Sequence, residues 1–160
     1  MIYTIGTSNR SVAEFFDPLQ ARGVKAIVDV RSKPYSRMRH FHREALKAEA
    51  AKRGMRYGWA GEHLGGLSDI RTDHADFQRA LDGIVALSLE APVAFFCAEG
   101  DPAQCHRTWK VAAALIAYRQ VNPTGILRGG GEEAASMTLR RVARRNYPAE
   151  LRTRSDGDQL

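Results

Sequence analysis

The residues best suited to chemistry lie in the segment CAEGDPAQCHR at 97–107. Cys97 closes the apolar run VAFFC, which is typical of a buried strand, and a thiol that follows such a strand and precedes a helix start can be activated as a nucleophile. Glu99, two residues further on, is the candidate proton donor for such a reaction. A free cysteine in a strand also commonly serves as a small buried hydrophobe, so both interpretations of Cys97 stand.

The second half of this segment predicts an anion site. Asp101-Pro102 is the pattern of a helix start and predicts a helix over about residues 102–120. Free backbone N–H groups at such a start attract anions, and Arg107 adds a guanidinium beside them. We therefore expect Arg107 to bind an anion; the alternative is a salt bridge from Arg107 to an acidic neighbour, which would tie the loop to the sheet.

Cys105 and His106 each have more than one candidate role. Cys105 is a core residue on a helix face, a resolving thiol for Cys97 or a ligand, and the sequence leaves these roles open. The spacing C-x7-C-H is no standard zinc pattern, and the sequence has no paired C-x2-C and no H-E-x-x-H motif. A histidine near a helix start more often hydrogen-bonds a backbone or carboxylate group than binds a metal. We therefore expect no metal and no cofactor.

An alternation of apolar runs and amphipathic segments predicts the elements that position these residues. Short β-branched or aromatic runs indicate strands, and capping residues before spaced apolar residues indicate helices. The expected strands are 2–6, 26–30, 55–59, 93–97 and 124–127, and the expected helices follow a capping box at Ser11–Glu14, span 43–53, begin at Thr72 or Asp73, span 102–120 and lie within 132–145. This order is typical of a single α/β domain, here residues 1–148, with a mostly parallel, Rossmann-like three-layer sheet flanked by helices on both faces. Residues 149–160 are expected to form a flexible polar tail.

Polar residues follow three of the expected strands. Ligands of parallel α/β sheets bind beyond the carboxyl ends of the strands, so we expect the ends at Gly6, Val30 and Cys97 to be adjacent. We also expect Asp29, at the end of an apolar strand, to orient Arg31 in a buried pair. The residues expected to line a phosphate- or nucleotide-like anion pocket are Ser8, Asp29, Arg31, Arg37, Cys105, His106 and Arg107, with Cys97 and Glu99 as the catalytic pair of a Cys-dependent enzyme.

The charge of the chain suggests a second class of function. The formal net charge is +6, and residues 21–60 hold eleven basic and three acidic side chains. A basic stretch, here 22–56, interleaved with aromatic residues can bind nucleic acid through phosphate contacts and base stacking. The alternative is that the aromatic residues belong to the core and the arginines form a solvated face. The aromatic residues concerned are Tyr35, Phe41, Tyr57 and Trp59.

A third class is a thiol redox sensor that uses the Cys97/Cys105 pair. Composition bears on all three classes of function. A chain of 160 residues with 44% hydrophobic and 26% charged side chains is typical of one globular domain. The longest strongly apolar run, 111–118, is too short for the ~20 residues of a membrane helix, and the start MIYTIGTSNR resembles a strand and not a secretory signal. Two cysteines do not make a disulfide framework. We therefore expect a cytoplasmic protein with reduced thiols and no membrane partner.

Four motifs together resemble one known family. They are TIGTSNRS at 4–11, VDVRSKPYSR at 28–37, LGGL at 64–67 and CAEGDPAQCHR at 97–107. In this order, over about residues 1–120, they are similar to the bacterial and archaeal family catalogued as domain of unknown function number 488. That family has no established activity, so the resemblance implies a motif order and a fold class only. The chain departs from the family pattern at Thr7, where histidine is frequent, and at Leu127-Arg128, where a histidine-isoleucine pair is common; both departures count against a histidine-based site.

Overall fold

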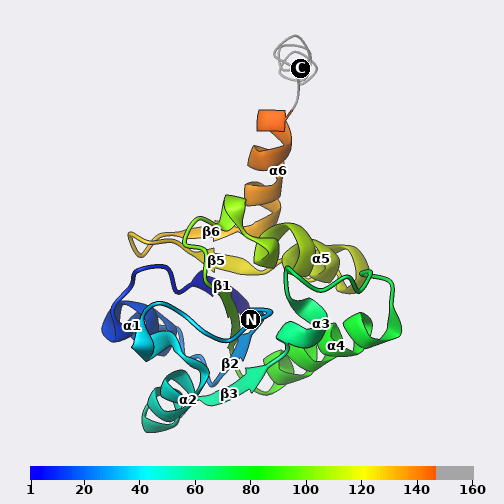
Figure 1. The fold of residues 1–160 in the computed structure, drawn as a ribbon. Coiled ribbons are helices and arrows are strands. Elements are labelled where there is room, and N and C mark those ends of the chain that lie inside the picture. The colour runs from blue at the N-terminus through cyan, green and yellow to red at the C-terminus, as the bar shows by residue number, and fades with distance from the viewer. Residues whose placement is uncertain (147–160) are drawn as a thin grey trace.

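A six-stranded sheet organises the computed structural model, which describes residues 1–146 (Figure 1). The strand order is β3-β2-β4-β1-β5-β6, and all neighbours pair in parallel except the antiparallel β5 and β6. The expected single α/β domain with a mostly parallel sheet is confirmed. The strands are β1 Ile2–Gly6, β2 Ala26–Asp29, β3 Arg56–Trp59, β4 Val93–Cys97, β5 Thr124–Ile126 and β6 Glu132–Ala134.

Helices cover both faces of this sheet. The helices α1, Val12–Ala21, and α2, Arg43–Lys52, lie on one face, and α4, Ala75–Glu90, and α5, Ala113–Arg119, lie on the other (Figure 1). The long crossovers between parallel strands require such helices, which is why the sequence alternates strand and helix signals. The helix α6, Ala135–Asn146, follows β6 at the sheet edge and packs on α5.

The central strands are buried on both faces, as their uninterrupted apolar runs predict. In β4, Phe95 points into the core beneath α4 and α5, while Phe96 points into the core beneath α1 and α2. In β2, Val28 points into the core beneath α4 and α5, and Ile27 points into the core beneath α1 and α2. With both faces filled by apolar side chains, the carboxyl-end edge of the sheet is left for polar groups.

Local signals set most element boundaries. Ser11 and Glu14 form the expected capping box of α1, and Gly23 adopts a left-handed φ of 70° just after that helix. The expected cap of α4 at Thr72 or Asp73 is wrong, because His74 is the N-cap and its Nδ1 accepts from the backbone N–H of Asp76 at 3.1 Å. Several capping residues in a row leave the true boundary undetermined by sequence.

The expected helix over 102–120 is also wrong at its start. Asp101 caps only a 3-10 turn, Pro102–Gln104, and Cys105 is extended, with φ −114° and ψ 137°. The helix begins after His106 with a π-helical stretch, Arg107–Ala112, and continues as α5. The local start signal is satisfied within one turn, since the Asp101 Oδ1 accepts from the Ala103 N–H at 2.9 Å.

Two short elements were not expected. The helix α3, Gly61–Leu64, lies between the strand expected at 55–59 and the helix expected to begin at Thr72 or Asp73, where no element was expected. The strand β6 precedes the last helix, which begins at residue 135. The tail expected over 149–160 lies outside the described residues. No helix of residues 1–146 is both long and apolar enough to cross a membrane.

Candidate functional site

The carboxyl ends of β1, β2 and β4 are adjacent, as expected. Gly6 pairs with Cys97 across β1 and β4, and the N–H of Val30 donates to the carbonyl of Phe96 at 3.0 Å. These three strand ends therefore meet at one edge of the sheet, with β4 in the middle. An open cavity of about 610 Å³ lies at this edge.

Two glycines allow the loops around the cavity to approach closely. A Cβ at Gly6 would overlap the backbone of Glu99, so β1 can end under the loop after β4 only with glycine there. A Cβ at Gly66 would lie 3.1 Å from the imidazole ring of His106. The glycines of the TIG and LGGL motifs thus bring the wall segments of the cavity together.

Cys97, Cys105 and His106 form a cluster of two thiols and an imidazole on the cavity wall. The Nδ1 of His106 lies 3.5 Å from the Cys97 sulfur and 3.9 Å from the Cys105 sulfur. All three of these atoms lie within 4.8 Å of one another. Both cysteines are free and buried, but each lines the cavity. The extended backbone at Cys105 is what directs its side chain toward the end of β4.

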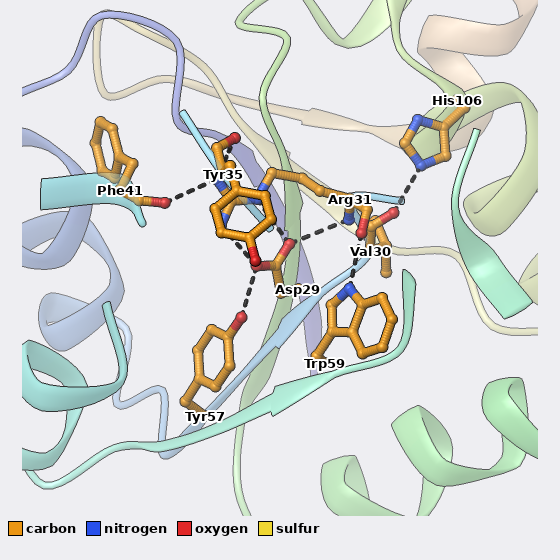
Figure 2. Close-up of polar contacts among 8 residues, drawn as sticks. All are labelled: Asp29, Val30, Arg31, Tyr35, Phe41, Tyr57, Trp59 and His106. Carbon is orange, nitrogen blue, oxygen red and sulfur yellow. Dashed lines mark hydrogen bonds and ion pairs between the residues drawn. The ribbon is translucent and has the colours of Figure 1, made fainter. Parts of the chain in front are cut away.

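The other ring nitrogen of His106 fixes the tautomer. Its Nε2 lies 3.0 Å from the carbonyl oxygen of Val30, at the end of β2 (Figure 2). A carbonyl oxygen only accepts hydrogen bonds, so Nε2 carries the hydrogen in the neutral ring. The lone pair of Nδ1 therefore faces the two sulfurs and can accept a thiol proton or bind a cation.

Arg107 lies fully buried behind this cluster. Its side chain is 1% exposed and donates to the backbone carbonyls of Glu99 and Gly100, while its Nε has no hydrogen-bond partner. Within residues 1–146, Arg107 forms no ion pair with a carboxylate. The salt bridge considered as the alternative to anion binding is thus replaced by carbonyl contacts that hold the loop after β4. A buried guanidinium stays charged, so it favours a negative charge nearby.

The thiol pair supplies that negative charge. Hydrogen bonding from the Cys97 thiol lowers the pKa of Cys105 below its usual range, and His106 and Arg107 act in the same direction. The hydrogen bond to Cys105, together with burial and the negative charge on Cys105, raises the pKa of Cys97 above its usual range. The pair therefore loses its first proton easily and retains its second, because two adjacent thiolates repel each other. The retained proton can lie on either sulfur, so Cys97 carries the negative charge when the proton lies on Cys105.

A second cluster occupies the end of β2 (Figure 2). The Asp29 carboxylate accepts from Arg31 Nε at 2.8 Å, from Arg31 Nη2 at 2.6 Å and from the Tyr57 hydroxyl at 2.7 Å. Arg31 Nη1 donates to the carbonyl of Phe41 at 2.8 Å, and the Trp59 indole donates to the carbonyl of Arg31 at 2.8 Å. The expected orienting role of Asp29 is confirmed, and these contacts leave the Arg31 guanidinium committed to protein partners.

Of the other expected site residues, Ser8 and Glu99 line the cavity and Arg37 does not. Ser8 lines the cavity with a left-handed φ of 45°, and its N–H donates to the carbonyl of Ala98 at 2.8 Å. Glu99 lines the cavity and is exposed, with one carboxylate oxygen 3.2 Å from the N–H of Asp101. Arg37 is exposed and is not among the residues that line the cavity.

The four aromatic residues within or just after the basic segment 22–56 are mostly engaged inside the protein. Phe41 is fully buried, Tyr57 and Trp59 make the hydrogen bonds given above, and Tyr35 alone among the four is largely exposed, at 69%. Trp59 also stacks under the guanidinium of Arg43. The segment thus presents few free aromatic faces for base stacking.

Several residues that line the cavity were not expected from the sequence, among them Lys33 and Trp109. Lys33 and Trp109 line the cavity, and Trp109 is half-exposed and meets the His106 ring edge-on at 6.3 Å between centroids. Both lie inside or next to the quoted motifs, Lys33 in VDVRSKPYSR and Trp109 two residues after CHR. Their proximity to motif residues was the available signal.

The three comparisons with known proteins give one finding. No curated protein and no solved structure matches the chain. The model of one family matches residues 11–76, a range that includes the Asp29 and Gly66 motifs and ends before Cys97. The matched model is that of the family which the four motifs resemble, the domain of unknown function DUF488, and it covers less than half of the chain.

Proposed function

We propose that this protein is a cysteine-dependent enzyme that acts on a small anionic molecule in the strand-end cavity. One observation carries the proposal: His106 Nδ1 lies 3.5 Å from the Cys97 sulfur while Nε2 is held by the Val30 carbonyl. A nucleophile, a base within reach of it and a third group that orients the base form the arrangement shared by enzymes with activated thiols.

The proposed roles follow from position. Cys97 is the attacking group because it is the more exposed of the two sulfur-bearing side chains, at 8% against 2% for Cys105. His106 Nδ1 takes the thiol proton as the sulfur attacks an electrophilic atom of the substrate, and the imidazolium keeps its Nε2–H bond to Val30. Glu99, at the cavity wall, gives a proton to the leaving group.

An anionic substrate is favoured by the charges around the cavity. Lys33 lines the cavity, is exposed and forms no ion pair within the described residues. Ser8 also lines the cavity, and its hydroxyl lies close to Gly100 as a further donor. Arg31 contributes less than expected, since Asp29 neutralises its charge.

The test is native-state alkylation with iodoacetamide at neutral pH, in the presence of a chelator, followed by peptide mapping. We expect selective labelling of Cys97, and slower labelling in His106→Ala by about 100-fold, the lower end of typical general-base contributions. His63→Ala, which removes a histidine of α3 outside the cluster, is the matched control and should label like the wild type. Labelling that occurs only after unfolding would assign Cys97 to the core and refute the proposal.

A further inference from the structure

We propose that Cys97, Cys105 and His106 form a three-ligand Zn²⁺ site with its fourth position open to the cavity. Metal binding itself goes beyond the proposed function, which uses only one of the two thiols. Cys105 has no role in that reaction as a bond-forming group, yet it lies on the cavity wall beside Cys97 and His106. In a metal site, both sulfurs and the imidazole are ligands of the same ion.

The distances between the ligand atoms fit tetrahedral zinc. Zn–S bonds of ~2.3 Å and Zn–N bonds of ~2.0–2.1 Å at tetrahedral angles place sulfur and nitrogen about 3.6 Å apart and the two sulfurs about 3.8 Å apart. The His106 Nδ1 lies 3.5 Å and 3.9 Å from the two sulfurs, and no pair of the three atoms exceeds 4.8 Å. Small side-chain rotations are therefore enough to seat the ion.

His106 is already oriented as a ligand. Metal-binding histidines usually donate their second ring N–H to a carboxylate or a backbone carbonyl, which fixes the ring and the tautomer. The Nε2 of His106 makes this bond to the carbonyl of Val30 at 3.0 Å, and the two residues are 76 positions apart in sequence. The strand end of β2 thus supplies the outer support of a site whose ligands come from β4 and the loop after it.

The donor set selects for thiophilic ions. Two thiolates and one imidazole suit Zn²⁺ and disfavour Mg²⁺ or Ca²⁺, which take oxygen ligands. Binding forms two Zn–S bonds and one Zn–N bond, and the thiol protons leave to solvent. Two thiolates neutralise the ion, so the charge of the buried Arg107 is then left to favour a hydroxide or a substrate anion at the open position.

Zinc and the proposed nucleophilic reaction use the same lone pairs. Because Zn²⁺ occupies Cys97 Sγ and His106 Nδ1, the metal-loaded protein has no free thiolate and no free base. Metal occupancy is therefore expected to switch off the thiol reaction; this consequence, unlike the binding, rests on the proposed function.

The experiment is a titration of the chelator-treated full chain with Co²⁺ and Zn²⁺. We expect Co²⁺ to give an intense visible spectrum typical of tetrahedral sites with a sulfur-to-cobalt charge-transfer band, and equimolar Zn²⁺ to displace it. Cys97→Ser, Cys105→Ser and His106→Ala should each weaken Zn²⁺ binding by more than the ~10–100-fold that loss of an outer-shell partner costs. His63→Ala should bind like the wild type, and thermal melts check that each variant is folded.

A ligand-conserving variant covers the case in which a deletion fails to fold. His106→Cys keeps three donor atoms, so it should retain Co²⁺ binding with a stronger charge-transfer band. Absence of that band in the wild type, or equal Zn²⁺ affinity in the wild type and Cys97→Ser, overturns the metal site. Alkylation of the metal-free protein separates the two proposals: Cys97 labelling without Zn²⁺ binding leaves the thiol function intact, and Zn²⁺ binding without labelling leaves only the metal site.

Discussion

Two clusters of polar side chains meet at the same edge of the sheet, and they differ in how their hydrogen-bonding groups are used. At the end of β2, the Asp29 carboxylate and the Arg31 guanidinium bond each other and their neighbours, and both side chains are almost fully buried (Figure 2). At the end of β4, the sulfurs of Cys97 and Cys105 share a single histidine nitrogen. We call the Asp29–Arg31 cluster closed, because its charged groups bond each other and their neighbours. We call the Cys97–Cys105–His106 cluster open, because its sulfurs and the His106 Nδ1 line the cavity without such partners.

This difference separates a scaffold from a candidate site more clearly than residue type does. Both clusters contain residues that the sequence predicts as site residues, and both follow apolar strands. In the closed cluster the negative and positive charges neutralise each other. In the open cluster the His106 Nδ1 lone pair faces the two sulfurs, and the buried Arg107 contacts backbone carbonyls and no carboxylate within residues 1–146, so its charge is not neutralised.

The largest expected effect comes from breaking the closed cluster with Asp29→Asn. Removing one charge of a buried ion pair leaves its partner uncompensated, which typically costs about 3–5 kcal/mol. Arg31 is 3% exposed, so water does little to compensate its charge. We expect a loss of this size in the free energy of unfolding, measured by urea denaturation.

The matched control is Asp82→Asn on α4. Asp82 pairs with Arg119 at 2.8 Å, but its side chain is 61% exposed, and such surface pairs contribute about 0–1 kcal/mol. Equal effects of the two substitutions would show that the Asp29 cluster is not a buried scaffold.

The closed cluster was largely predictable from sequence because its central contact is local. Asp29 and Arg31 are two residues apart at the end of an apolar strand, so their side chains meet once the strand forms. The Tyr57 and Trp59 contacts were not predictable, since they depend on the register of β3 against β2. Because the sequence does not show how β3 pairs with β2, these two aromatic residues were candidates for base stacking.

The open cluster was less predictable because it depends on long-range contacts. The Asp101-Pro102 signal gave a helix start at the wrong place, and Cys105 is extended where a helical conformation was expected. The contact between His106 and Val30 spans 76 residues and forms only when β2 and β4 are neighbours. Sequence spacing therefore argued against a metal, whereas the folded loop brings three ligand atoms together.

The second expected effect concerns the loop that frames the open cluster. Arg107→Lys keeps the charge but cannot reproduce two parallel N–H donors to the carbonyls of Glu99 and Gly100. A buried acceptor left without a partner costs about 1–3 kcal/mol, so the melting temperature should fall. If Arg107 only holds the loop, the fall is equal with and without phosphate, whereas loss of a phosphate-induced shift in the variant would instead make Arg107 an anion clamp.

The third expected effect is smaller and isolates one bond of the closed cluster. Tyr57→Phe removes the hydroxyl bond to Asp29, which keeps both contacts with Arg31, so we expect a loss of about 1 kcal/mol. Burial, and then the Asp29 charge, raise the pKa of Tyr57 above its usual range. Because the folded pKa is the higher one, its stabilisation is complete below the ordinary tyrosine pKa of ~10 and is lost as pH rises above it.

An alkaline spectrophotometric titration measures this directly. The wild type should retain a tyrosine fraction that resists ionisation near pH 11, and Tyr57→Phe should lack it. A Tyr57→Phe variant with an unchanged titration curve would mean that the hydroxyl is not held by Asp29.

The smallest expected effect on stability comes from Cys97→Ser in the open cluster. A serine hydroxyl, like the thiol, has both His106 Nδ1 and the Cys105 sulfur beside it as acceptors, so the new polar group has a partner and the loss should stay under about 1 kcal/mol. Ala94→Ser, three residues earlier in β4 at 0% exposure, places the same hydroxyl against apolar neighbours and should cost about 1–3 kcal/mol. Urea denaturation of both variants decides the comparison. If Cys97→Ser costs as much as Asp29→Asn, then Cys97 stabilises the fold as the closed cluster does, and the distinction between scaffold and site at this sheet edge is wrong.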